Sequence, residues 1–241
     1  MGKVYAVKKG FKTGKFYDWE TCKAQVNGYK GAEYKSFSGA TAEQQADAYL
    51  GVYYGSSVLV LEPIGQKSAD YMSFEPYDNP YNCTEDTCIA FVDGSYDKKT
   101  TRFAFGAVLF TKDAKYCLCG CDDTPYLSPM RNVSGELLGA MMAVLKAESL
   151  GMKKIMIVHD YEGVAEWVAT DHKPWQTNKR GTFEYAEFIS NHRANIDIAF
   201  KWVKGHSGIE HNEEADKLAS KAIKEDIRCD ASSVFADFGS Q

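Results

Sequence analysis

The 241-residue chain has a globular composition, with 44% apolar and 25% charged residues and a net charge of −5 at pH 7. This excludes wholesale disorder, and no apolar run approaches the roughly 18 residues of a membrane-spanning helix. The N-terminus lacks the apolar core of a signal peptide, and the seven cysteines do not suggest a disulfide framework. We therefore expect a cytoplasmic protein with reduced thiols, no membrane contact and no obligate protein partner.

The charges are segregated along the chain. Residues 1–38 carry eight lysines and three acidic residues, a balance of +5, whereas residues 39–87 carry one lysine and eight acidic residues, a balance of −7. A basic module is thus followed by an acidic spacer. The negative overall charge does not argue against a nucleic-acid partner for the basic module.

Residues 1–50 alternate short extended and helical segments. We expect strands at 5–7 and 32–37, a short helix at 19–25, and a helix at 42–50 that Thr41 would cap. Residues 51–86 show no sustained period and scattered Pro, Gly and Ser, which is typical of a linker.

The chain from residue 88 onward has the pattern of an α/β domain. Strands are expected at 88–92, 103–110, 115–121, 155–159 and 197–203, and helices at 134–150 and 210–224. The unbroken apolar runs 88–92 and 155–159 are typical of central strands covered on both faces. The expected fold is a five-stranded mixed sheet flanked by helices.

Four carboxylates accompany these elements. Asp93 and Asp160 each follow a central strand, and would therefore share the ligand-binding rim of the sheet. Glu136 and Asp216 lie on helices beside apolar residues, where a bare charge needs a partner or a cation. Together they form the hard oxygen set that Mg²⁺ or Mn²⁺ prefers. Taken singly, each also fits a turn, a helix-dipole partner, an N-cap or a surface ion pair.

The sequence around these carboxylates resembles the ribonuclease H family in order and spacing. The matching segments are FVDGS at 91–95, NVSGEL at 132–137, HD at 159–160, VKGHSG at 203–208 and NEEADKLA at 212–219. The resemblance implies four catalytic and metal-binding carboxylates, a mobile-loop histidine, an asparagine that precedes the last carboxylate, and an asparagine that contacts the RNA strand. The four carboxylates are Asp93, Glu136, Asp160 and Asp216. The loop histidine is His206, the asparagine before the last carboxylate is Asn212, and the asparagine that contacts the RNA strand is Asn132. The family usually has Ser where this chain has Tyr161, and Ala where it has Gly135.

Residues 3–50 resemble the hybrid-binding, or viroplasmin-like, domain of eukaryotic-type ribonuclease H. In that domain an aromatic pair stacks on DNA sugars, while Tyr and Lys contact the RNA in the minor groove. The matching residues are Trp19, Tyr34, Tyr5 and Lys35, and Ser36 replaces a second Lys. The alternative is that the aromatic residues form the core of the small domain.

Residues 172–180 mix basic, amide and Trp residues and resemble the basic protrusion of some ribonucleases H. This resemblance implies a substrate contact by Trp175, and the alternative is a solvated loop.

The resemblance implies a hybrid-binding domain at 1–50, a linker at 51–86, a catalytic domain at 87–226 and a tail at 227–241. Its implied activity is hydrolysis of the RNA strand of RNA–DNA hybrids by two Mg²⁺ or Mn²⁺ ions, which leaves 5′-phosphate and 3′-hydroxyl ends. Double-stranded RNA is a second possible ligand. The alternatives are a non-catalytic protein that binds hybrid or double-stranded RNA, and a transposase- or integrase-type nuclease on the same fold.

Overall fold

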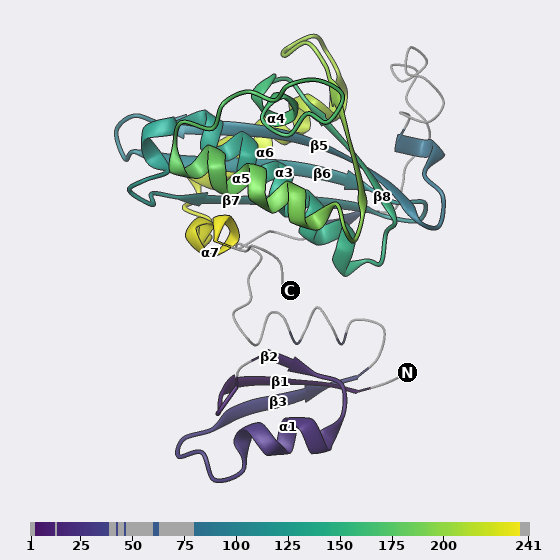
Figure 1. Cartoon of the computed structure of the whole chain (residues 1–241), viewed down its shortest axis with the longest axis vertical. Helices are drawn as coiled ribbons and strands as arrows, with labels where there is room; N and C mark the ends of the chain where they lie inside the picture. Colours follow the sequence, from purple (N-terminus) through teal and green to yellow (C-terminus); the bar gives the residue numbers. More distant parts are fainter. Residues whose placement is uncertain are drawn as a thin grey trace. The chain divides into compact units, whose positions relative to one another are not determined.

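The chain divides into two compact units, residues 1–53 and 54–241, each described by itself (Figure 1). The structure is a computed structural model that describes residues 3–12, 14–38, 42, 46, 60–62 and 80–236. Among these residues no helix is both long and apolar enough to cross a membrane.

The first unit is built on a three-stranded antiparallel sheet in the order β2-β1-β3. Its elements are β1 (Val4–Lys9), β2 (Gly14–Phe16), α1 (Trp19–Val26) and β3 (Glu33–Phe37). Because strand side chains alternate between faces, Val7 packs on Cys22 and Val26 of α1, whereas Ala6 packs with Ala42. Both faces of β1 are therefore covered. The expected helix at 42–50 lies outside the described residues, except for positions 42 and 46, which are helical and buried.

A six-stranded mixed sheet forms the second unit, in the order β4-β7-β6-β5-β8-β9. Its strands are β4 (Val60–Glu62), β5 (Thr87–Asp97), β6 (Arg102–Phe110), β7 (Lys115–Asp122), β8 (Lys154–His159) and β9 (Asp197–Trp202). β5, β8 and β9 are parallel, and the remaining pairs are antiparallel. The five expected strands and their mixed arrangement are confirmed. The sixth, β4, lies within the stretch 51–86 that was interpreted as a linker.

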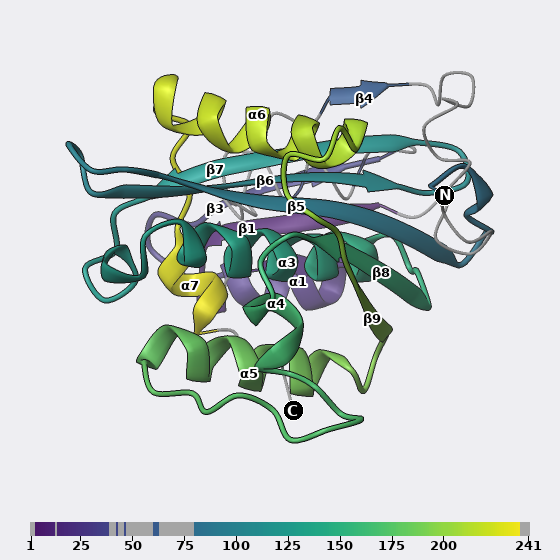
Figure 2. The same ribbon diagram turned by 90° about the horizontal axis from the view of Figure 1, so that it is seen from above.

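Helices cover both faces of this sheet, as Figure 2 shows. α3 (Asn132–Ser149) packs on β5 and β6 from one side, with α5 (Arg180–His192) against its outer surface, and α6 (Glu210–Lys224) packs on β6 from the other side. Shorter helices are η2 (Pro80–Asn82), η3 (Ser128–Met130), α4 (Gly163–Glu166) and α7 (Ala231–Phe235). This arrangement brings the middle of β5, where Asp93 lies within the strand and not after it, together with the end of β8 and the start of α3.

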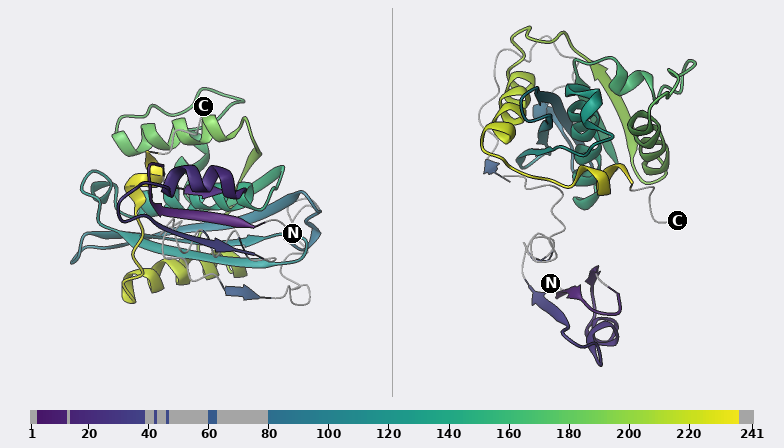
Figure 3. Two further views of the ribbon diagram at one scale, coloured as in Figure 1. Left: turned by 90° about the horizontal axis from the view of Figure 1, so that it is seen from below. Right: turned by 90° about the vertical axis from the view of Figure 1, so that its left-hand side faces the viewer.

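The segment 227–236, expected to be part of a tail, packs against the rest of the second unit. Arg228 forms a parallel bridge with Cys121 of β7, and its guanidinium donates to Asp123 at 2.7 Å. α7 follows, drawn in yellow near the C-terminal end of the ribbon (Figure 3), and contacts α3. Its Phe235 is completely buried in the core. The seven cysteines are all free thiols.

Candidate active site

Two glycines let α3 lie directly on the sheet. A β-carbon on Gly135 would lie 1.9 Å from the carbonyl oxygen of Ala104, and one on Gly94 would lie 2.5 Å from the backbone nitrogen of Glu136. Real β-carbons do not approach other atoms so closely, so both positions require glycine. This contact places Glu136, in the first part of α3, beside the end of the apolar run in β5.

Three of the four predicted carboxylates converge at this point. Asp93 on β5, Glu136 on α3 and Asp160 after β8 each offer an oxygen, and these oxygens lie within 4.8 Å of one another. Asp93 and Glu136 are buried and Asp160 is half-buried. The backbone N–H of Gly94 donates to Asp93 Oδ1 at 2.6 Å, whereas Glu136 Oε2 is buried without a hydrogen-bond partner.

The electrostatics of this cluster favour a cation. Burial, reinforced by the charge of Asp160, raises the pKa of Asp93 well above its ordinary value. Burial also raises the pKa of Glu136, and the neighbouring charges of Asp93 and Asp160 raise it further. Converging carboxylates with an unpartnered buried oxygen match the donor set of a divalent cation. The residues therefore fit the metal that the sequence predicted.

Asp160 is held by groups from two other elements. Asn212 Nδ2 of α6 donates to Asp160 Oδ2 at 3.3 Å, and Trp202 Nε1 at the end of β9 donates to the Asp160 carbonyl at 3.2 Å. A β-carbon on Gly205 would lie 2.6 Å from Asp160 Oδ2, so this glycine lets the following loop reach the carboxylate. Asn212 was predicted from the sequence, whereas Trp202 was not. No local sequence pattern shows that the strand ending at Trp202 lies beside Asp160.

Asp216 and His206 lie around this triad. Asp216 is half-buried on α6, and its charge contributes to raising the pKa of Asp93, but it lies outside the group of three. The close packing of α6 on β6 depends on Gly106, where a β-carbon would lie 2.0 Å from the Ala215 carbonyl oxygen. His206 is exposed in the loop before α6, with a positive φ of 51°. The structure thus brings Asp93, Glu136 and Asp160 together, leaves Asp216 outside this group and places His206 at the surface.

The family model described as RNase H matches residues 85–224, which is more than half of the chain, and the model described as Ribonuclease H1 N-terminal domain matches residues 3–50. The chain belongs to the ribonuclease H family. It is a ribonuclease H, a hydrolase, and its two units contain the N-terminal domain and the RNase H domain.

Relatives with both parts span nearly the whole chain. Ribonuclease H1 of Mus musculus is 26% identical over 93% of this chain and 90% of its own length, and that of Homo sapiens is 26% identical over 93% and 91%. Among solved structures, RNase H1 from the halophilic archaeon Halobacterium salinarum NRC-1 aligns with a TM-score of 0.46 at 21% identity, covering 58% of this chain and 98% of that one.

Two residues of the RNase H domain, His159 and Tyr161, flank Asp160. His159 is fully buried, and burial lowers its pKa to about 4, so the ring is neutral at pH 7. Its Nδ1 lies 3.0 Å from the carbonyl oxygen of Tyr161, which identifies Nδ1–H as the donor. The Tyr161 ring lies 5.9 Å from that of Trp167, centre to centre. Burial raises the pKa of Tyr161, with a further contribution from the charge of Glu136.

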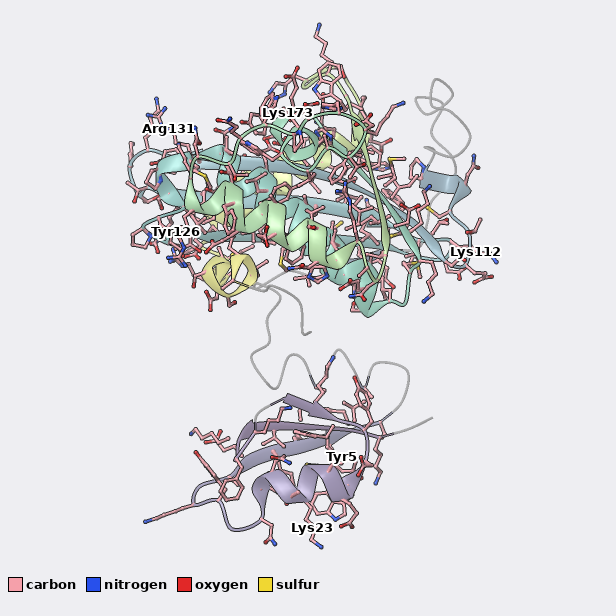
Figure 4. All side chains as sticks on the ribbon, in the orientation of Figure 1. Tyr5, Lys23, Lys112, Tyr126, Arg131 and Lys173 are labelled. Atoms are coloured by element: carbon pink, nitrogen blue, oxygen red, sulfur yellow. The ribbon has the colours of Figure 1, made fainter. Side chains whose placement is uncertain are left out.

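A cavity of about 410 Å³ opens beside this aromatic pair in the RNase H domain. Its lining includes Tyr161 and Trp167, together with Arg131, Asn178 and Lys179. The predicted contact residue Trp175 lies beside it, because its ring lies 5.8 Å from that of Trp167. Trp175 is exposed, as is Lys173 in the same loop, which Figure 4 labels. Asn132, the first residue of α3, is also exposed.

In the N-terminal domain the predicted aromatic residues form one continuous cluster. The Trp19 ring lies 5.6 Å from that of Tyr5, labelled in Figure 4, and 5.9 Å from that of Tyr34. Trp19 and Tyr34 are exposed and Tyr5 is half-buried, so the cluster is a surface and not the core of the domain. Lys35 is exposed on the neighbouring position of β3.

Proposed function

We propose that this ribonuclease H hydrolyses the RNA strand of RNA–DNA hybrids with two divalent cations, leaving 5′-phosphate and 3′-hydroxyl ends. The observation that carries the proposal is the convergence of Asp93, Glu136 and Asp160 within 4.8 Å, with one buried oxygen left unpartnered. Membership of the ribonuclease H family supports the substrate, and the relatives with the same two parts are named Ribonuclease H1.

Asp93, Glu136, Asp160 and Asp216 would hold the divalent cations, and Asp93 would serve both ions. When bound, Mg²⁺ or Mn²⁺ would activate a water for attack on the phosphate and stabilise the charge on the leaving oxygen. The protein supplies the negative charge and the geometry. Asp93 and Glu136 are fixed by the packing of α3 on the sheet, and their burial makes neutralisation by a cation favourable.

The neighbouring side chains orient Asp160 and handle protons. Asn212 and Trp202 donate to the side chain and the carbonyl of Asp160, respectively, which restricts how its carboxylate turns. His206 is exposed on a loop close in sequence to Trp202 and Asn212. We assign His206 to proton transfer or product release, because imidazole is a poor ligand for Mg²⁺.

The proposed substrate contacts come from both domains. Asn132 would contact the RNA strand, and Trp175 would contact the duplex beside the cavity. In the N-terminal domain, the Tyr5–Trp19–Tyr34 cluster and Lys35 would bind the hybrid, since proteins recognise RNA-containing duplexes through their shape, 2′-hydroxyls and phosphates. This domain supplies no proposed metal ligand, so it contributes affinity and not chemistry.

The test is cleavage of an end-labelled RNA–DNA hybrid, with and without Mg²⁺, beside the same sequence as duplex DNA and as duplex RNA. We expect Mg²⁺-dependent cleavage of the hybrid alone. Ligation of the products would show that they carry 5′-phosphate and 3′-hydroxyl ends. Binding without cleavage would instead identify a non-catalytic binding protein. Joining or nicking of duplex DNA would identify a strand-transfer nuclease.

A further inference from the structure

A second exposed aromatic pair lies on the N-terminal domain, apart from the cluster assigned to the hybrid. The side chains of Phe11 and Tyr29 are 66% and 39% exposed, and their ring centres lie 5.3 Å apart at an interplanar angle of 85°. Phe11 therefore leaves most of its apolar surface in water. A phenylalanine that packs into the core of so small a domain would be buried.

The backbone holds this pair in a fixed position. The N–H of Phe11 donates to the carbonyl of Gln25 at 2.8 Å, and a β-carbon on Gly10 would lie 2.5 Å from that same oxygen. Tyr29 lies in a tight turn between Gly28 and Gly31, whose φ angles of 81° and 80° favour glycine. Because two turns fix the backbone of both residues before any ligand binds, binding costs little backbone entropy.

The pair is displaced along α1 from the first cluster. Trp19 is the first residue of this helix, whereas Phe11 is tied to Gln25, six residues later. At 1.5 Å per residue, the two aromatic surfaces are separated by about 9 Å along the helix axis. The second pair therefore lies beyond the three rings that would contact the duplex.

The surroundings of the pair point to nucleic acid. Lys12 and Lys30 are exposed next to Phe11 and Tyr29 in sequence, and Lys9, also exposed, forms an ion pair with Glu33. Protein-binding patches are typically poor in lysine. Exposed rings among lysines are typical of sites that bind single strands, because an unpaired base offers its face for stacking whereas a paired base does not.

We propose that Phe11 and Tyr29 form a stacking platform for unpaired nucleotides that continue from an RNA–DNA hybrid. This rests on the proposed binding of the hybrid by the Tyr5–Trp19–Tyr34 cluster. The N-terminal domain would then recognise a junction between hybrid and single strand, with the duplex on the first cluster and the extending strand on the second. The ligand is a nucleotide whose unpaired base has a free face for stacking and whose neighbouring phosphates are attracted by Lys12 and Lys30.

The experiment measures binding by fluorescence anisotropy with the full chain in EDTA, which prevents cleavage. The probes are a short blunt RNA–DNA hybrid, the same hybrid with a single-stranded DNA extension of about six nucleotides, and the single strand alone. We expect the extended hybrid to bind about tenfold more tightly than the blunt one, which corresponds to one or two stacked bases.

Three variants separate the two surfaces. Phe11→Leu keeps an apolar side chain but removes the ring, and should abolish the preference for the extension without changing affinity for the blunt hybrid. Phe11→Trp keeps a ring and should retain the preference. Trp19→Ala should weaken binding of both hybrids by the same factor. Circular dichroism checks that each variant is folded.

The outcomes distinguish this inference from the function on which it rests. Equal affinity of the wild type for blunt and extended hybrids, or an unchanged preference in Phe11→Leu, overturns the platform while leaving hybrid binding intact. Failure of the wild type to bind the blunt hybrid overturns the assigned role of the first cluster. Binding of the single strand that depends on Phe11 would then support the platform alone.

Discussion

Gly94 of β5 and Gly135 of α3 face each other so closely that a β-carbon on Gly135 would lie 2.9 Å from the Gly94 Cα. This contact sets the distance between the helix and the sheet. Gly94 directly follows Asp93, and Gly135 directly precedes Glu136. Both carboxylates are proposed metal ligands. Close packing of the backbone therefore fixes how far apart these carboxylates lie.

Gly135→Ala should disrupt the site by pushing α3 away from the sheet. Its β-carbon meets backbone at 1.9 Å, and backbone cannot move aside cheaply, so we expect a loss of about 2 kcal/mol or more in the free energy of unfolding. Cleavage should fall as Glu136 is displaced. Gly139→Ala, one turn along the same helix, is the matched control, because its nearest contact is a Val92 side-chain atom at 3.3 Å. That variant should change stability by less than about 1 kcal/mol. Urea unfolding measures the free energy of unfolding of both variants. Equal losses of stability in Gly135→Ala and Gly139→Ala would refute the steric explanation.

Asp93→Asn should reduce hybrid cleavage by about a thousandfold or more, because a bridging ligand loses its charge. The same change should raise the melting temperature in EDTA, since it removes a buried charge next to Glu136 and Asp160. Mg²⁺ should then stabilise the variant less than the wild type. Asp97→Asn, at the half-buried last position of the same strand, serves as the control and should cleave normally. Near-normal turnover by Asp93→Asn in Mg²⁺ would contradict the assignment.

His206→Ala should lower the turnover rate by about tenfold to a hundredfold, the lower range for a group that assists proton transfer. The Mg²⁺ concentration that gives half-maximal activity should change little, because His206 lies on an exposed loop and is not assigned to the metal. A metal titration of the two proteins measures this directly. A large increase in that concentration would make His206 a ligand instead.

Stability should fall in acid because of His159. Its pKa is lowered from 6.5 to about 4 by burial, so between these pH values the unfolded chain binds a proton that the folded chain excludes. The folded state should therefore lose up to about 3 kcal/mol as the pH falls from 6.5 to 4. Asp93 and Glu136 have the opposite effect, since their raised pKa values make the folded state bind protons more readily. Comparing wild type with His159→Thr by urea unfolding in EDTA isolates the imidazole. Parallel stability curves for the two proteins would show that His159 is not the cause.

Deletion of residues 1–50 should weaken hybrid binding by about tenfold or more while preserving the rate at saturating substrate. The second unit contains its own core and the proposed metal ligands, so its chemistry does not depend on the deleted residues. The affinity of the shortened protein should also depend less steeply on salt, because lysine–phosphate contacts are lost. Steady-state kinetics at several salt concentrations test this, and complete loss of cleavage at saturating substrate would count against it.

The sequence alone was sufficient to predict the five longer strands of the second unit and its helices α3 and α6, but not α5. The apolar runs that contain Phe91 and Ile157 identified central strands, since only a strand covered on both faces is apolar at consecutive positions. The carboxylates that follow these runs could then be placed at one rim of the sheet. The short or weakly patterned segments were missed, such as β2 and β4, because three residues carry no detectable period.

Tertiary structure decided what surrounds the carboxylates. The hydrogen bonds from Trp202 and Asn212 to Asp160 join residues more than 40 positions apart, and no local pattern encodes such a distance. The packing of Phe235 beside α3 could likewise not be predicted from the sequence of the segment that was expected to be a tail. Local periodicity indicates which face of a helix or strand is apolar, but not which element packs against that face. The burial and pKa values of Asp93, Glu136 and His159 are therefore set only when distant elements pack together.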